Sequence, residues 1–256
     1  MFTSLLVGSS YCLADDISLS FLGSLKKAER FYDELKEYSE KYKIFELDLL
    51  LSVAMVESGG NDDLISRAGA RGLMQVMPRT YRAMKVKGYI EAGVKYLKQQ
   101  IVEFYDYNSF RRAILAYHAG PSRVRRNSVP LTSESYYENV NLYRNIFMPE
   151  NMNKIQKGID NLEIIVLGKS QTWEKLAEKY NCSVIELRLY NSFLAYFDSD
   201  IVKKGRTFVY PKKSVEVIKD SFYTVRKGDL APLLRNAFGI EIEKSIESGD
   251  KIWIEK

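Results

Sequence analysis

The sequence predicts a multidomain protein of the α+β class, with an all-helical region followed by small units that mix strands and helices. Two observations carry this prediction. Apolar residues recur at helical spacing over residues 20–148, and beyond residue 160 short strand-like runs alternate with amphipathic helical segments. A length of 256 residues leaves room for one to three domains.

The first predicted helices lead to a buried one. Residues 25–42 carry apolar side chains on one side and charges elsewhere, which predicts an amphipathic surface helix. Between Leu47 and Val56 apolar residues cover nearly every side, and Gly59-Gly60 follow. This pattern is typical of a buried helix, and its last turn carries one ionisable residue, Glu57.

Three further segments complete the helical region. Helical spacing predicts helices over residues 88–107, 109–119 and 133–147, the second of which ends at Gly120-Pro121. The polar, aperiodic residues 149–160 are the best candidate for a linker.

The C-terminal part reads as one strand-helix-helix-strand unit and a shorter copy. The first unit covers residues 161–212, with strands near Leu162 and Pro211. A related pattern returns over residues 220–256, but the distance from its helix to its closing strand is shorter by about one helix. We therefore expect a degenerate repeat.

Composition and charge exclude several classes of function. Hydrophobic residues make up 46% of the chain and charged residues 28%, as in ordinary globular proteins. A net charge of +5 is compatible with binding to an anionic cell-wall polymer, a membrane surface or nucleic acid, and does not distinguish among these partners. One histidine and two cysteines argue against a zinc site, and no glycine-rich phosphate-binding motif is present. No metal or organic cofactor is implied.

Residues 1–14 resemble a short secretory signal that would be cut after Ala14, although no lysine or arginine follows Met1. We therefore expect export to the periplasm or cell envelope. Lipidation at Cys12 is disfavoured because the bulky Tyr11 precedes it. Cys182 would then be the one remaining cysteine, and we interpret it as a small buried apolar residue.

Glu57 is the main candidate for a catalytic group. A carboxyl group at the end of an apolar helix loses hydration of its charged form, which raises its pKa, and a carboxylic acid protonated near neutral pH can protonate a glycosidic oxygen. Taken alone, such a position more often belongs to a helix that simply ends in solvent. Asp62 and Asp63 follow in a polar turn, where we expect both to be solvated.

Three motifs, read in order, resemble the catalytic domain of the lytic transglycosylases. They are Glu57-Ser58, the segment GLMQVMP at residues 72–78, and AYHAG at residues 116–120, with Tyr136 downstream. The resemblance covers roughly residues 40–148 and implies a lysozyme-like fold. It also implies cleavage of the β-1,4 bond between N-acetylmuramic acid and N-acetylglucosamine in peptidoglycan, with formation of a 1,6-anhydro end.

The resemblance assigns roles to individual residues. Glu57 would be the single acid and base. The residues that match positions lining the saccharide cleft are Ser58, Met74, Gln75, Tyr117, His118, Ala119 and Tyr136. The sequence has His118 where the family usually has asparagine. The resemblance therefore does not predict the reaction rate or its dependence on pH. A structural role for His118 is the alternative.

The unit over residues 161–212 resembles the LysM module, a small peptidoglycan-binding domain, through residues such as Gly168, Trp173 and Asn191. A catalytic domain followed by such modules resembles the architecture of the membrane-bound lytic murein transglycosylase D type. The resemblance implies glycan contacts at Gly168, Lys169, Ser170, Gln171, Thr172 and Asn191. The alternative is that both units are structural spacers.

Two other functions stay open at this stage. A lysozyme-type hydrolase of the same bond would let water attack in place of the sugar hydroxyl. A non-catalytic peptidoglycan-binding protein would have lost activity through the change at His118. The basic run Arg123–Arg126 could meet acidic stem peptides, but such a run is more often solvated. We expect peptidoglycan strands as the partner, no nucleic acid, and a monomer.

Overall fold

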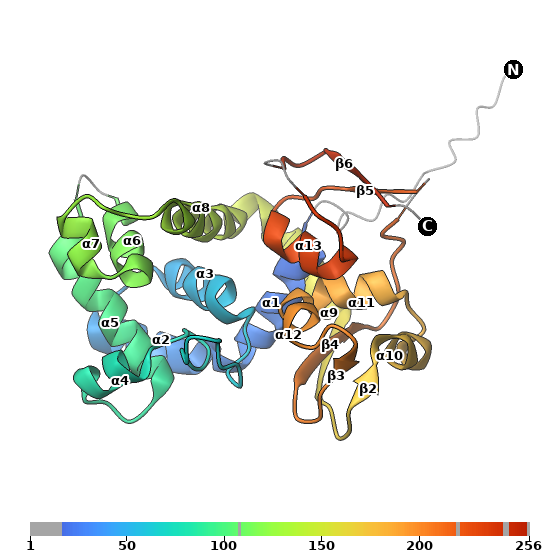
Figure 1. Cartoon of the computed structure of the whole chain (residues 1–256), viewed down its shortest axis with the longest axis horizontal. Helices are drawn as coiled ribbons and strands as arrows, with labels where there is room; N and C mark the ends of the chain where they lie inside the picture. The colour runs from blue at the N-terminus through green and yellow to red at the C-terminus, as the bar shows by residue number, and fades with distance from the viewer. Residues whose placement is uncertain (1–16, 107–108, 219–220, 243–245, 255–256) are drawn as a thin grey trace, which may run out of the picture.

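Two lobes lie side by side in the computed structural model, a helical one built from α2 to α8 and a mixed one that carries the C-terminal units (Figure 1). The structure describes residues 17–106, 109–218, 221–242 and 246–254. The predicted signal segment 1–14 and Cys12 lie outside the described residues.

The N-terminal part is helical, as the sequence predicted. Its helices are α1 (Leu19–Ala28), α2 (Tyr32–Tyr42), α3 (Leu47–Ser58), α4 (Pro78–Met84), α5 (Tyr89–Phe104), α6 (Arg111–Ala119), α7 (Pro121–Arg125) and α8 (Leu131–Ile146), with a 3-10 turn, η1 (Glu29–Phe31), between α1 and α2.

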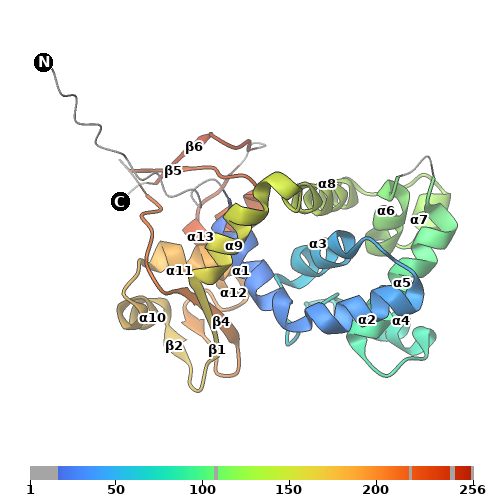
Figure 2. The ribbon, with the colours of Figure 1, turned by 180° about the vertical axis from the view of Figure 1, so that it is seen from behind.

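Helix α3 lies at the centre of the helical lobe. It packs against α1, α2 and α8, and Figures 1 and 2 both show it between α2 and α8. Leu49, Leu50 and Val53 are fully buried because neighbours cover α3 on several sides. The helix ends at Gly59, whose φ of 60° is a left-handed conformation that glycine adopts without steric cost.

Helix α1 is the first departure from the sequence prediction. The expected surface helix over residues 25–42 is split by η1, and its first part is buried between α3, α9 and α11. Even Lys27 is 1% exposed, and its Nζ donates to the carbonyl oxygen of Tyr190 at 3.4 Å. The C-terminal units pack over this face of α1, which the amphipathic pattern of residues 25–42 did not predict.

The segment expected to be a linker is structured. Residues 149–160 form the 3-10 turn η2 (Pro149–Asn151) and helix α9 (Met152–Asp160), which packs on α1. Ile155 and Ile159 are buried, and a Cβ at Gly158 would lie 2.6 Å from a Leu22 methyl carbon. Most residues of this segment are polar, but Ile155, Gly158 and Ile159 recur at i, i+3 and i+4 and form a narrow apolar stripe on one side of α9.

The first C-terminal unit begins and ends with the predicted strands, but it contains three helices in place of the two expected, and a second short strand pair. Strand β1 (Leu162–Val166) pairs antiparallel with β4 (Thr207–Pro211), with Leu162 opposite Pro211. Between them lie α10 (Trp173–Tyr180), α11 (Val184–Tyr190), α12 (Ser192–Phe197) and a short pair, β2 (Gln171–Thr172) and β3 (Ile201–Val202). Trp173, Leu176 and Phe208 form its core. Cys182 is half-buried against that core.

The second unit is shorter, as expected. Strand β5 (Phe222–Thr224) pairs antiparallel with β6 (Lys251–Trp253), and the one helix described between them is α13 (Ala231–Phe238). Helix α13 packs on α11 and α12. Tyr223 and Leu234 join the same hydrophobic core as Leu50 and Val53 of α3. The two lobes are therefore continuous in their interior.

Among the described residues, no helix has the length and apolar character needed to cross a membrane.

Candidate active-site cleft

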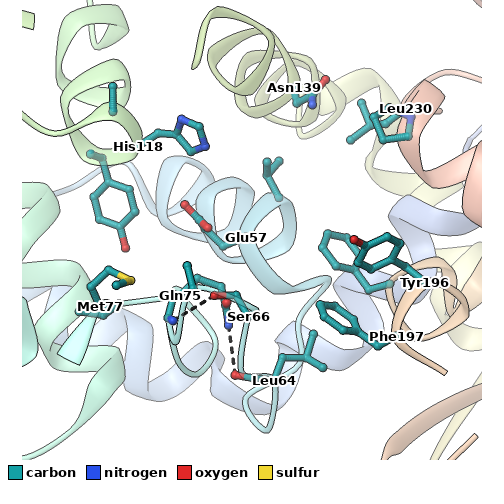
Figure 3. Close-up of a pocket in the computed structure, with 18 of the residues that line it drawn as sticks. Glu57, Leu64, Ser66, Gln75, Met77, His118, Asn139, Tyr196, Phe197 and Leu230 are labelled. Atoms are coloured by element: carbon teal, nitrogen blue, oxygen red, sulfur yellow. Dashed lines mark hydrogen bonds between the residues drawn. The ribbon is translucent and has the colours of Figure 1, made fainter. Parts of the chain in front are cut away.

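A cleft of about 810 Å³ opens beside the C-terminal end of α3. Most of its lining comes from the end of α3 with the loop that follows, from helix α6, and from helices α12 and α13 of the C-terminal units, and single residues of α4, α5 and α8 complete it. Figure 3 shows Glu57 in the middle of this cleft, with His118 on one side and Tyr196, Phe197 and Leu230 on the other.

Glu57 is the one carboxyl group among the described residues that line the cleft. Burial disfavours its charged form and raises its pKa to about 8. The Tyr136 hydroxyl is buried without a hydrogen-bond partner at normal geometry, yet it lies near enough to Glu57 to oppose this rise in part. The side chain at this position is thus a protonated acid at neutral pH.

Ser58 does not line the cleft, contrary to the prediction. Its side chain is fully buried, and its Oγ lies 3.0 Å from the Ala54 carbonyl oxygen and 2.8 Å from that of Leu73. The second contact ties the end of α3 to the GLMQVMP segment. The hydroxyl therefore positions the loop next to Glu57 and is not available to a sugar.

The GLMQVMP segment is held in a tight loop. Arg71 and Val76 pair through two backbone hydrogen bonds, and Gly72 and Gln75 both adopt positive φ, of 76° and 45°. A non-glycine residue in this region is strained and persists because its surroundings hold it. The Gln75 amide nitrogen donates to the carbonyl oxygens of Leu64 (3.2 Å) and Gly72 (2.9 Å), which fixes the side chain at the cleft wall.

Met74 is also absent from the lining. It is 1% exposed and packs on α5, where a Cβ at Gly93 would lie 2.7 Å from its own Cβ. Its carbonyl oxygen accepts a 2.7 Å hydrogen bond from the Tyr117 hydroxyl. The ring of Tyr117 lines the cleft as predicted, but its hydroxyl already has a protein partner.

His118 lines the cleft, as does Ala119. Its Nδ1 lies 2.9 Å from the Ser133 Oγ, and its ring stacks on Tyr136 with centroids 4.3 Å apart and 15° between the planes. Partial burial lowers the pKa of the imidazole. His118 is therefore a neutral side chain that has a structural partner and also faces the cleft, and its role toward a sugar stays a prediction.

Tyr136 lies beside the cleft and not in its lining. It is 6% exposed, beneath the His118 ring, and its hydroxyl approaches Glu57. The sequence analysis expected Tyr136 to line the cleft, and its position beside Glu57 and outside the lining differs from that expectation.

The remaining charged candidates lie away from the cleft lining. Asp62 pairs with Arg30 at 3.1 Å and Asp63 with Arg206 at 3.2 Å, and both carboxylates are exposed. In the basic run, the Arg125 Nη2 donates to Glu103 at 2.8 Å. Within the described part of the chain, no group of three or more histidine, cysteine or acidic residues could hold a metal ion.

The turn predicted to bind glycan in the first C-terminal unit is in part accessible. Gly168, Lys169 and Ser170 are exposed, while Gln171 and Thr172 are half-buried in β2.

Asn191 is a wrong prediction as a glycan contact. It is fully buried, and its amide nitrogen donates to Leu187 (2.9 Å) and Val209 (2.7 Å) while its oxygen accepts from the Val209 N–H (2.9 Å). This side chain joins α11 to β4, and no polar group is left for a sugar.

The sequence prediction missed the lining that comes from the C-terminal units. This part of the wall consists of Phe193, Tyr196 and Phe197 of α12 together with Leu230, Pro232, Leu233 and Asn236 at α13. The aromatic run SFLAYF was the available signal, but nothing in the sequence connects residues near 195 with Glu57. Asn139 of α8 is a further lining residue that the motif analysis did not single out.

Comparisons with known proteins agree with these motifs. Residues 34–138 match the family model of the Transglycosylase SLT domain. A transglycosylase of Enterobacteria phage PRD1 is 34% identical over 82 residues, which is 30% of this chain and 30% of the phage protein. The chain thus spans less than a third of that relative.

Two solved structures are similar in part. An inactive mutant of the lytic transglycosylase Slt from Pseudomonas aeruginosa is 23% identical, with a TM-score of 0.39, covering 47% of this chain and 24% of the other. The 70 kDa soluble lytic transglycosylase from Escherichia coli is 22% identical, with a TM-score of 0.33, covering 66% and 24%. The residues 34–138 that match the family model include Glu57, Gln75 and His118 of the cleft lining.

Proposed function

We propose that this protein is a peptidoglycan lytic transglycosylase that cleaves the β-1,4 bond between N-acetylmuramic acid and N-acetylglucosamine. The observation that carries the proposal is a single carboxyl group, Glu57, in a cleft large enough for saccharides, with a pKa raised to about 8 by burial. Standard glycosidases use two carboxyl groups at set separations, and the described lining offers one.

Glu57 performs two proton transfers in this proposal. As an acid it protonates the glycosidic oxygen while the bond from that oxygen to the muramic acid C1 breaks. As a carboxylate it then accepts the proton of the C6 hydroxyl, whose oxygen attacks C1. The products are a free N-acetylglucosamine 4-hydroxyl and a 1,6-anhydromuramic acid end, and Glu57 regains its proton.

The neighbours of Glu57 support these steps by position. The Tyr136 hydroxyl lies close enough to Glu57 to favour its carboxylate form, which assists the first transfer, in which Glu57 gives its proton to the glycosidic oxygen. Gln75 and the Tyr117 ring line the cleft, where an amide and an aromatic face suit sugar substituents and rings.

The C-terminal units would add glycan binding outside the cleft. The antiparallel strands β1 and β4, which enclose the helices of the first unit, and the exposed turn Gly168–Ser170 support a LysM-type role for that unit, and the second unit is shorter. Attachment to the polymer raises the local concentration of substrate. With peptidoglycan as substrate, we place the protein in the cell envelope, after export.

Mass spectrometry of the soluble products from purified peptidoglycan tests the proposal. The residue 15–256 protein should release muropeptides with 1,6-anhydro ends, and Glu57→Gln should lower the rate by about 10²–10⁴-fold, as for loss of a general acid. Asp62→Asn is the matched control, because this nearby carboxylate is exposed and paired with Arg30.

Two other outcomes would contradict the transglycosylase proposal. Reducing ends in place of anhydro ends would make the protein a hydrolase. No products from the unmodified protein, with retained sedimentation on the polymer, would make it a binding protein.

A further inference from the structure

One end of the cleft is built by a part of the chain that lies outside the SLT domain. Helix α12 presents Tyr196 to the cleft with 49% of its surface exposed, next to Phe193 and Phe197. The rings of Tyr196 and Phe197 meet edge to face, with centroids 5.1 Å apart and 83° between the planes. An exposed tyrosine inside a concave site is a group that a ligand can cover.

Helix α12, which carries Tyr196, contacts the end of α3 and the loop that follows it in the helical lobe. The guanidinium of Arg67, on the loop after α3, lies 5.6 Å from the centre of the Tyr196 ring. Phe193, one turn earlier on α12, covers Gly59 so closely that a Cβ there would lie 2.4 Å from the Phe193 ring. The aromatic wall therefore contacts the end of the helix that carries Glu57.

The loop after α3 is anchored in the first C-terminal unit at two more places. Leu64, which lines the cleft, is also buried in the core that contains Trp173 and Phe208. Arg206 bridges Asp63 at 3.2 Å and Asp198 at 3.1 Å, and the Asp198 carboxylate is buried. These contacts hold the unit against the cleft, in contrast to a module on a flexible tether.

Helix α13 completes this wall. It packs on α12, and Leu233 and Asn236 face the same cleft as Tyr196. The wall thus combines flat apolar surface with a single amide, which is the chemistry that recognises N-acetylated sugar rings through their apolar faces and their acetamido groups. In Figure 3, Tyr196 and Phe197 lie on the far side of Glu57 from His118.

We propose that α12 and α13 form a saccharide subsite of the catalytic cleft, in which the Tyr196 ring stacks on an N-acetylhexosamine unit of the glycan strand on one side of the cleaved bond. The inference rests on the proposed function for its substrate class. The C-terminal units then have a role inside the active site, in addition to any binding at the Gly168–Ser170 turn.

The test is glycan binding in the Glu57→Gln background, where the strand is not cut. Calorimetry with a purified, uncrosslinked peptidoglycan glycan hexasaccharide gives the affinity of Glu57→Gln alone and with Tyr196→Ala, Tyr196→Phe or Phe45→Ala. We expect Tyr196→Ala to weaken binding about tenfold, the equivalent of about 1.4 kcal/mol. Tyr196→Phe keeps the ring and should bind like the parent. Phe45, which is 78% exposed and absent from the cleft lining, provides the control for loss of a surface aromatic.

Each result decides between the two proposals. Unchanged affinity in Tyr196→Ala, or an equal loss in Phe45→Ala, would overturn the subsite and leave the transglycosylase proposal standing if the unmodified protein releases anhydro products. Weaker binding in Tyr196→Ala, without any products from the unmodified protein, would keep the subsite and overturn the reaction. If the Glu57→Gln parent binds no hexasaccharide, the subsite is overturned, and release of anhydro products by the unmodified protein decides the reaction separately. Thermal melting confirms that each variant is folded.

Discussion

At the scale of single residues, Glu57 carries the proposed chemistry, and its buried carboxyl group also makes the stability of the fold depend on pH. Glu57 titrates at about 8 in the folded protein and at 4.5 as a free side chain. Between these values the folded state binds the extra proton, so the free energy of unfolding falls as the pH rises. Stability from Glu57 is fully present below pH 4.5 and is lost as the pH rises through 8.

Glu57→Gln should therefore be more stable than the unmodified protein, with a larger difference at pH 8.5 than at pH 5. A gain of about 1 kcal/mol corresponds to roughly 2–4 °C in melting temperature for a chain of this size. Melting curves at the two pH values measure it. A constant difference between the variants at both would show that burial does not shift this group.

His118 makes a second prediction at this scale. Partial burial lowers the pKa of the imidazole below 6.5, so it is neutral at pH 7 and acquires charge at acidic pH. His118→Asn should keep activity at pH 7 within about tenfold, or about 1.4 kcal/mol, of the unmodified enzyme. It should also remove the acidic limb of the pH-rate profile between pH 4 and 7. An unchanged acidic limb would assign that limb to another group.

At the scale of elements, buried side-chain hydrogen bonds hold neighbouring segments in place. Ser58 ties α3 to the loop that carries Gln75, and Asn191, at the end of α11, makes two hydrogen bonds to Val209 of β4 and one to Leu187 of α11. Both residues were predicted as sugar contacts, yet both are fully buried. Side chains that can recognise a sugar can equally satisfy buried backbone groups, and burial separates the two roles.

Asn191→Ala should lower the free energy of unfolding by about 2–4 kcal/mol, because the Val209 N–H and carbonyl would lose buried partners. Chemical denaturation measures the change. Ser199→Ala, at an exposed position nearby, is the matched control and should have little effect. A change below about 0.5 kcal/mol for Asn191→Ala would mean that water replaces these bonds.

At the scale of the whole molecule, the lobes share one interior. The same hydrophobic core includes Leu22 of α1, Val53 of α3, Val209 of β4 and Leu234 of α13. Opening either lobe would expose apolar surface of the other, which couples their unfolding.

The full chain should therefore unfold in a single thermal transition, with equal calorimetric and van't Hoff enthalpies. Differential scanning calorimetry tests this. Two resolved transitions would instead describe a catalytic domain with independent modules, and would contradict the rigid aromatic wall at Tyr196.

The sequence by itself determined the helical region, the outer strands and first helices of the next unit, and the short second copy, because hydrophobic periodicity is a local property. It also nominated Glu57, Gln75, Tyr117 and His118, since short motifs carry the chemistry of a site. Tertiary structure alone decided that α9 is not a linker, that α1 is covered, and that Tyr196 reaches the cleft of Glu57. The physical reason is that hydrophobic periodicity marks which face of an element is apolar, whereas the distant segment that covers this face is chosen by three-dimensional complementarity.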